Sequence, residues 1–209
     1  MQKLLDKLHN SNIPIKILMR PESYSIENSC FYNVKDKIEA DGGEIIYGWK
    51  LHETEFLLEA ERHAIWKSDV GELIDITPDK NHRNYILFLE ENKNWKYNGE
   101  YTGNVRVNNT SNPFVDHLII IDEIRDELTK TGSRKSRMIV EFPEVSLKLM
   151  QFLENDRNQR YKALKKGFSI HDNCFCGNNK SYLKCHGWQL ESVLNNALQQ
   201  VKTKIKASC

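Results

Sequence analysis

The feature that most constrains this chain is a cluster of metal-ligand side chains near its C-terminal end. Residues 174–187 read Cys-Phe-Cys-Gly-Asn-Asn-Lys-Ser-Tyr-Leu-Lys-Cys-His-Gly. Three thiolates and one imidazole make a complete tetrahedral set for Zn²⁺, and a closed set leaves no position for a catalytic water. The alternative is a chance grouping of free thiols. The spacing predicts a structural zinc site at Cys174, Cys176, Cys185 and His186.

The same segment resembles the SEC-C motif, which occurs at the tail of the bacterial preprotein translocase ATPase and on many unrelated proteins. The pair Asn178-Asn179 stands where that motif usually has Ser-Gly. The resemblance implies a zinc-bound module that docks to a protein or to the ribosome, and it covers only this short segment. The matching positions are Cys174, Cys176, Gly177, Tyr182, Cys185, His186 and Gly187.

A second group of chemically active residues is spread over the N-terminal half. Cys30 follows Asn28 and Ser29, two residues that favour helix N-caps, and it begins a run with helical character. The positive end of a helix favours the thiolate form of a cysteine placed there. His63 lies in a strand-like run and Asp75 in the next one. In this order the three residues could supply a nucleophile, a base and the group that orients the base.

Each of these residues also has a plain structural interpretation. Cys30 could be a small buried hydrophobic residue or a spare thiol, and His63 a histidine satisfied inside the core. Asp75 stands between two isoleucines, and a carboxylate buried there without a partner would be costly. In a further alternative, Cys30 and His63 are ligands of another metal ion.

Residues 28–78 resemble the transglutaminase-like and papain-like cysteine enzymes. The likeness rests on the sequence His63-Ala64-Ile65-Trp66 and on Asp75-Ile76-Thr77-Pro78. This chain has one extra residue between His-Ala and Trp, and it lacks the usual Gly/Trp context before the cysteine. The resemblance implies a helix that bears the cysteine and packs on a sheet that bears the histidine and the aspartate.

The resemblance also implies roles for the individual side chains. Cys30 would attack an amide or thioester carbonyl, His63 would protonate the leaving group, and Asp75 would hold the histidine tautomer. The oxyanion would be bound by the backbone N–H of Cys30 and by Asn28. Trp66 is a candidate for the wall of the cleft, although an aromatic residue on a strand is more often part of the core.

The hydrophobic pattern predicts an α+β fold with an antiparallel meander, a helical region and a small zinc module. We expect a cysteine-enzyme domain over residues 1–110, helices over 111–167 and the zinc module with a C-terminal helix over 168–209. Turns of a few residues separate the strand-like runs, which favours antiparallel neighbours. These runs are Glu44–His52, Phe56–Lys67, Glu72–Thr77 and Tyr85–Glu90.

Composition narrows the partners that the chain can have. In its 209 residues, 30 basic side chains nearly cancel 29 acidic ones, so no overall field favours nucleic acid or an anionic membrane. The basic loop Ser133–Arg137 could still contact RNA, with a solvated loop as the alternative. No apolar run approaches the ~18 residues that span a bilayer. The charged opening residues predict no signal peptide.

These observations support two hypotheses for the function. The first is a cytoplasmic cysteine-dependent acyl-transfer enzyme (peptidase, amidase, deamidase or transglutaminase-like) whose zinc tail docks to a protein partner. The second is a non-enzymatic zinc-containing adaptor that binds a protein or the ribosome. The cytoplasmic assignment follows from five unevenly spread cysteines, which suit a reducing compartment better than a disulfide framework.

Overall fold

The computed structural model describes residues 1–207, and the chain folds into two compact units. The first unit contains Met1–Glu53 and Leu58–Glu100, and the second contains Thr54–Leu57 and the chain from Tyr101 onward. Cys209 lies outside the described residues. The limits expected at residues 110 and 167 concern independent folding and stay predictions.

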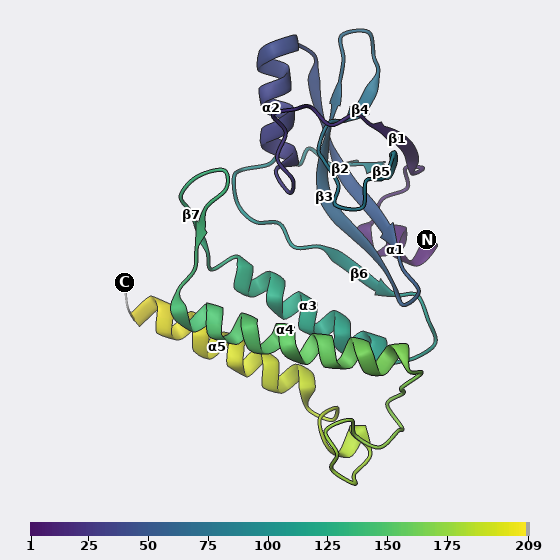
Figure 1. Ribbon diagram of the computed structural model, residues 1–209, viewed down its shortest axis with the longest axis vertical. Coiled ribbons are helices and arrows are strands. Elements are labelled where there is room, and N and C mark those ends of the chain that lie inside the picture. The colour runs from purple at the N-terminus through teal and green to yellow at the C-terminus, as the bar shows by residue number, and fades with distance from the viewer. Residues whose placement is uncertain (208–209) are drawn as a thin grey trace. The chain divides into compact units, whose positions relative to one another are not determined.

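The first unit is a mixture of helices and strands, as the hydrophobic pattern predicts. Its second helix begins at Cys30, and the carbonyl of the N-cap residue Ser29 accepts the N–H groups of Tyr32 and Asn33. Figure 1 shows this helix beside the strands of the unit. The elements are α1 (Gln2–Leu8), α2 (Cys30–Asp41), β1 (Ile15–Met19), β2 (Glu44–Glu53), β3 (Leu57–Lys67), β4 (Leu73–Asp75) and β5 (Tyr85–Glu90).

The strands of the first unit form a closed sheet, and the expected antiparallel meander holds for β2, β3 and β4 but is wrong for β5. Their order is β2-β5-β1-β4-β3, and β2 also pairs with β3. β1 lies between β4 and β5, antiparallel to β5 but parallel to β4, with Leu18 opposite Ile74 and Met19 opposite Asp75. A meander needs chain neighbours to be sheet neighbours, and the insertion of β1 separates β4 from β5.

Alternation along β3 and β4 sorts their side chains onto two faces. Ala64, Trp66 and Ile74 belong to the cluster that packs against α2 through Val34. His63 and Asp75 have the opposite parity. They therefore share the other face of the sheet, which also carries Ile65. The middle of α2, at Val34, packs on the first face, whereas Cys30 at the start of this helix is close enough to act on His63.

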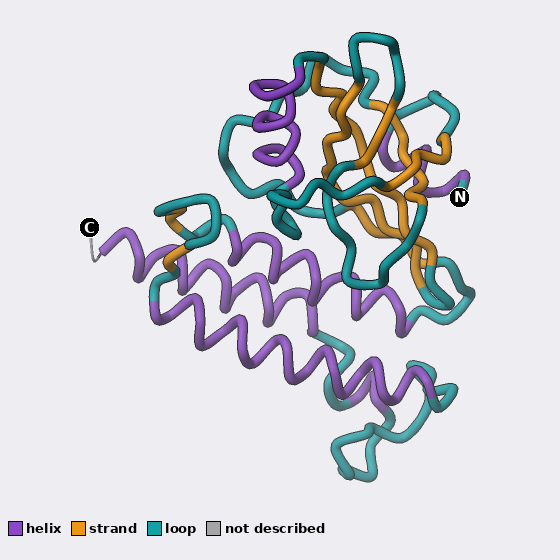
Figure 2. Tube along the Cα trace, turned by 45° about the horizontal axis from the view of Figure 1, so that its top comes forward, coloured by secondary structure: helices purple, strands orange, loops and turns teal. Residues whose placement is uncertain are grey.

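Three long helices form the core of the second unit and lie side by side in Figure 2. Leucine, isoleucine and valine side chains from all three make one buried cluster, so the apolar stripe of the last helix is core. No helix within residues 1–207 has both the length and the apolarity to cross a bilayer. The elements are β6 (Val105–Asn108), α3 (Phe114–Thr129), β7 (Ser133–Arg134), β8 (Val140–Glu141), α4 (Glu144–Lys165), the 3₁₀ helix η1 (Tyr182–Lys184) and α5 (Leu190–Ala207).

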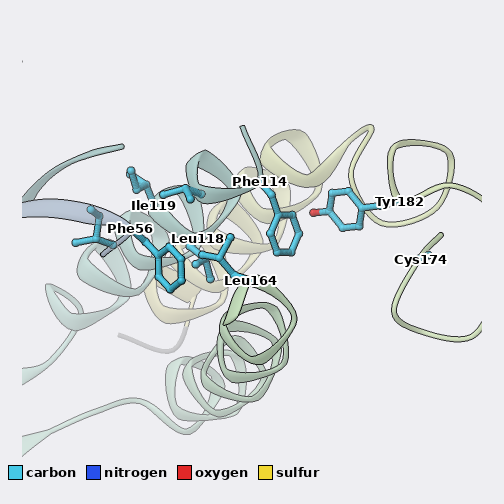
Figure 3. Packing of buried hydrophobic residues seen from close by; sticks show 9 residues of the cluster. Phe56, Phe114, Leu118, Ile119, Leu164, Cys174 and Tyr182 are labelled. Atoms are coloured by element: carbon cyan, nitrogen blue, oxygen red, sulfur yellow. The ribbon is translucent and has the colours of Figure 1, made fainter. Parts of the chain in front are cut away.

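A second cluster joins the cysteine-rich segment to these helices. Figure 3 shows the ring of Tyr182 beside that of Phe114, with Leu164 of α4 close by. The two ring centroids are 5.0 Å apart in an edge-to-face arrangement. Gly187 is required here, because a Cβ at this position would lie 2.5 Å from the Tyr182 ring. Cys174 is buried in the same cluster, so the segment is part of the core of the unit.

Candidate functional site

His63 and Asp75 form a buried hydrogen-bonded pair in the first unit. His63 Nε2 lies 3.0 Å from Asp75 Oδ2, and the two residues are 3% and 0% exposed. The other carboxylate oxygen, Oδ1, accepts the backbone N–H of Thr77 at 3.0 Å. Both oxygens of Asp75 are therefore engaged, and the carboxylate holds the imidazole ring in one orientation.

The side chain of Cys30 is close enough to the same histidine ring to raise the pKa of His63 through its charge and hydrogen bonding. Because Nε2 is taken by Asp75, Nδ1 is the nitrogen that remains for the thiol. Cys30 is the first residue of α2 and is 7% exposed. The structure thus brings Cys30, His63 and Asp75 together in the order that the sequence pattern suggested.

The electrostatics of this group favour a charged histidine. Burial lowers the pKa of His63, but the charges of Asp75 and Cys30 and the hydrogen bonds to both outweigh burial and raise this pKa to about 10. An imidazolium between a carboxylate and a sulfur is the arrangement that activates a cysteine nucleophile. The surroundings of His63 therefore favour its protonated form at neutral pH.

We expect the His63 imidazole to stay protonated from neutral pH up to about pH 10. Imidazole ¹⁵N chemical shifts measured across the titration would test this. In a Cys30→Ser variant the pKa should fall, because one of the two raising charges is lost, yet Asp75 should keep it above the ordinary value of ~6.5. A pKa below ~6.5 in that variant would contradict the assigned role of Asp75.

The same shift has a consequence for stability, which is best measured in the Cys30→Ser background. The folded-state pKa of His63 is above its unfolded-state value, so the stabilising contribution of His63 is complete below pH ~6.5. It is lost as the pH rises through the folded-state pKa. Urea unfolding at several pH values should show this decline, and a matched Cys30→Ser, His63→Gln variant should show less of it.

Asn28 and Trp66 are the two residues expected to complete the cleft. They lie near opposite ends of α2. Asn28 is exposed two residues before Cys30, with a left-handed backbone (φ 59°) that asparagine tolerates. Trp66 donates its indole N–H to the carbonyl of Gly42 at 2.9 Å. Gly42 caps the C-terminal end of α2. Trp66 therefore packs at the opposite end of that helix from Cys30.

Two residues that sequence reasoning missed are linked to this group, Thr77 by a hydrogen bond to Asp75 and Asn33 through Thr77. Asn33 is fully buried one turn after Cys30 and donates to the hydroxyl of Thr77 at 3.2 Å. The backbone N–H of Thr77 is in turn the donor to Asp75. The available signal was weak: an asparagine inside a helix has low helix propensity and often has a side-chain hydrogen bond to make.

A second carboxylate lies near the histidine on β3. Glu61 has the same parity as His63 and lies 3.3 Å from His52 of β2, measured from Oε2 to Nε2. Burial raises its pKa, but the hydrogen bond to His52 and the positive charge of His63 outweigh burial and lower it. Glu61 therefore adds negative charge to the surroundings of the imidazolium.

The predicted metal ligands converge in the second unit. One donor atom from each of Cys174, Cys176, Cys185 and His186 lies within 4.8 Å of all the others, a set that could hold a metal ion. The Cys176 and Cys185 sulfurs are 3.7 Å apart. Metal–sulfur bonds of ~2.3 Å in a tetrahedron place two sulfurs ~3.8 Å apart. The donor set and its spacing therefore fit a tetrahedral ion.

The nitrogen that His186 offers to this group is Nδ1. It lies 3.1 Å from the sulfur of Cys174 and 3.3 Å from that of Cys185. Burial and the two neighbouring thiols raise the pKa of Cys185 to about 11. Three thiolates so close together repel one another, so a bound cation is what would allow all of them to ionise.

The comparisons with known proteins identify no family. Protein-family models, curated proteins and solved structures all give no match to this chain.

Proposed function

We propose that this protein is a cytoplasmic cysteine-dependent acyl-transfer enzyme with a zinc-binding tail. The observation that carries the proposal is the contiguous group of Cys30, His63 and Asp75, buried together at the start of a helix. A thiol, an imidazole and a carboxylate in hydrogen-bonded sequence are the parts that nucleophilic catalysis needs. The closed sheet with its adjoining helix supports the transglutaminase-like and papain-like resemblance.

The geometry supports a two-step reaction. The Cys30 thiolate attacks the carbonyl carbon of an amide or thioester, and the C–S bond forms as the carbonyl π electrons move to oxygen. The backbone N–H of Cys30, at the start of the helix, stabilises that oxyanion. The tetrahedral intermediate then collapses, and Nδ1 of His63 gives its proton to the leaving nitrogen or sulfur. An acyl-enzyme and a neutral imidazole remain.

In the second step His63 takes a proton from water or from an amine as that group attacks the acyl-enzyme. The C–S bond breaks, the product leaves and the thiolate–imidazolium pair is restored. Water gives a peptidase, an amidase or a deamidase, and an amine gives a transglutaminase. Asp75 holds the ring and stabilises its charge in both steps.

We further propose that Zn²⁺ is the ion held by Cys174, Cys176, Cys185 and His186. The closed set of four protein ligands supports a structural ion with no position for substrate. The SEC-C resemblance supports docking of this module to a protein partner or to the ribosome. The metal-binding cluster also favours the second candidate function, a non-enzymatic adaptor that uses the same module.

An activated acyl probe would decide between the two candidates. We expect incubation with an activated ester to leave one acyl group on Cys30, detected by intact-protein mass spectrometry and peptide mapping. Cys30→Ser should abolish this adduct at pH 7, while Lys35→Ala, on the exposed side of α2, should leave it unchanged. A Cys30 that is no more reactive than a free thiol in the unfolded chain would exclude the enzyme and leave the adaptor.

A further inference from the structure

We infer that Asn33 and Thr77 are positioning residues that hold the Cys30 helix in register with the strand that carries Asp75. The inference rests on the proposed function, because it assigns these residues to the alignment of the same thiol, imidazole and carboxylate. The hydrogen bonds of Asn33 and Thr77 go to Ile26, to Asp75 and to one another. Their effect would pass through the residues that they hold.

The amide of Asn33 joins α2 to two other segments. Its Oδ1 accepts the backbone N–H of Ile26 at 3.0 Å, and its Nδ2 donates to the carbonyl of Ile26 at 2.8 Å. The same Nδ2 donates to Thr77 Oγ1 at 3.2 Å. Asn33 therefore fixes the loop that precedes Cys30 as well as the segment that follows Asp75.

These contacts close a circuit around the site. His63 bonds to Cys30 and to Asp75, and the Oδ1 atom of Asp75 accepts the N–H of Thr77. The Thr77 hydroxyl accepts from Asn33, which lies one helical turn after Cys30. The circuit consists of three hydrogen bonds, the electrostatic contact of Cys30 with His63, the covalent frame of Thr77 and that one turn of helix. A shift of α2 relative to β4 would have to break at least one of these bonds.

The burial of Asn33 and Thr77 indicates that their hydrogen bonds serve to fix orientation. Asn33 is 0% and Thr77 4% exposed, and their neighbours Val34 and Ile76 belong to an apolar cluster. An amide in such surroundings is costly unless it is hydrogen bonded, and apolar residues of similar shape could fill the space equally well. Directional bonds do what apolar packing does not: they fix orientation. A misplacement of ~1 Å can slow a reaction by ~10²-fold.

Thr77 allows a sharp test, because its hydrogen bond to Asn33 can be removed while its hydrogen bond to Asp75 is kept. The backbone N–H that bonds Asp75 is present in every variant, whereas the hydroxyl that bonds Asn33 is lost in Thr77→Val and kept in Thr77→Ser. Valine preserves the branched shape and the burial. The pair of variants therefore isolates the link to Asn33.

The experiment measures the rate of Cys30 alkylation by iodoacetamide from pH 5 to 9, together with the pKa of His63 by ¹⁵N NMR. We expect Thr77→Ser to stay within about twofold of the unsubstituted protein. Thr77→Val should alkylate roughly tenfold more slowly at pH 7, with a lower pKa of His63. Circular dichroism establishes that each variant is folded. If Thr77→Val does not fold, Thr77→Ala is used instead, because it lacks the same hydroxyl.

The outcomes separate this inference from the proposed function. If the Asn33–Thr77 hydrogen bond only stabilises the fold, Thr77→Val should lower the melting temperature but leave the pH profile of Cys30 alkylation and the pKa of His63 unchanged. That result would overturn the positioning role. An equal loss of alkylation rate in Thr77→Ser and Thr77→Val would overturn the positioning role as well. If alkylation of the unsubstituted protein does not depend on His63, the proposed function itself fails, and this inference fails with it.

Discussion

Replacement of His63 by glutamine is expected to slow alkylation of Cys30 at pH 7 by about one to two orders of magnitude. The thiolate is the reactive form of cysteine, and in this structure its hydrogen-bonded neighbour is a histidine whose pKa lies at about 10. Glutamine removes that positive charge. Its amide can still donate to Asp75, so the buried carboxylate keeps a partner. The rate would be followed by quenched time points and intact-protein mass spectrometry.

His52→Gln is the matched control for this measurement. His52 lies on the neighbouring strand β2 and pairs with Glu61. Its replacement should leave the alkylation rate of Cys30 within a few-fold of the unsubstituted protein, since it alters only the more distant charges. Equal rates in the His63→Gln variant and the unsubstituted protein would show that the imidazolium does not activate Cys30, and the acyl-transfer proposal would not survive.

Removal of the metal is expected to unfold more than the segment that binds it. A structural Zn²⁺ contributes an apparent ~10–16 kcal/mol of binding free energy at neutral pH in small metal-folded domains. Here Cys174 and Tyr182 belong to the same buried cluster as Phe114, Leu118 and Leu164 of the long helices. Loss of the ion should therefore loosen the ends of α3 and α4 as well.

Two hydrogen bonds strengthen this expectation. The Tyr182 hydroxyl lies 2.6 Å from His117 Nδ1 on α3, and it also accepts a hydrogen bond from the buried guanidinium of Arg160 on α4. Desolvation of this tyrosine outweighs the nearby arginine and raises its pKa to about 12, so the hydroxyl stays neutral. A metal loop that unfolds would take the Tyr182 hydroxyl away from Arg160, whose guanidinium also bonds Asp156.

Hydrogen exchange with and without a chelator would measure the effect. We expect faster amide exchange around Phe114–Leu118 and Leu164 in the chelated protein and in Cys174→Ser, and one zinc per chain by elemental analysis of the untreated protein. Amides of β2 and β5 in the first unit serve as the internal control. Faster exchange confined to residues 168–189 would show that the segment folds as a separate module, as its short motif suggests.

The local chemistry of both sites could be predicted from the sequence. Ligand type and spacing singled out Cys174, Cys176, Cys185 and His186, because cysteines and a histidine so close in the chain can meet after only a few turns. The capping residues before Cys30 placed that thiol at a helix start. That His63 and Asp75 share a face could not be predicted, because they lie on different strands and their facing depends on the register of β3 against β4.

The tertiary structure decided everything that depends on distant segments. The position of β1 between β4 and β5 closes the sheet, and no local pattern specifies a partner so far along the chain. The same holds for the bond from Asn33 to Thr77 and for the burial of Cys174 among helix residues. Spacing and periodicity describe contacts within a few residues. Long-range contacts follow from which surfaces bury the most apolar area together, and only the folded chain shows that choice.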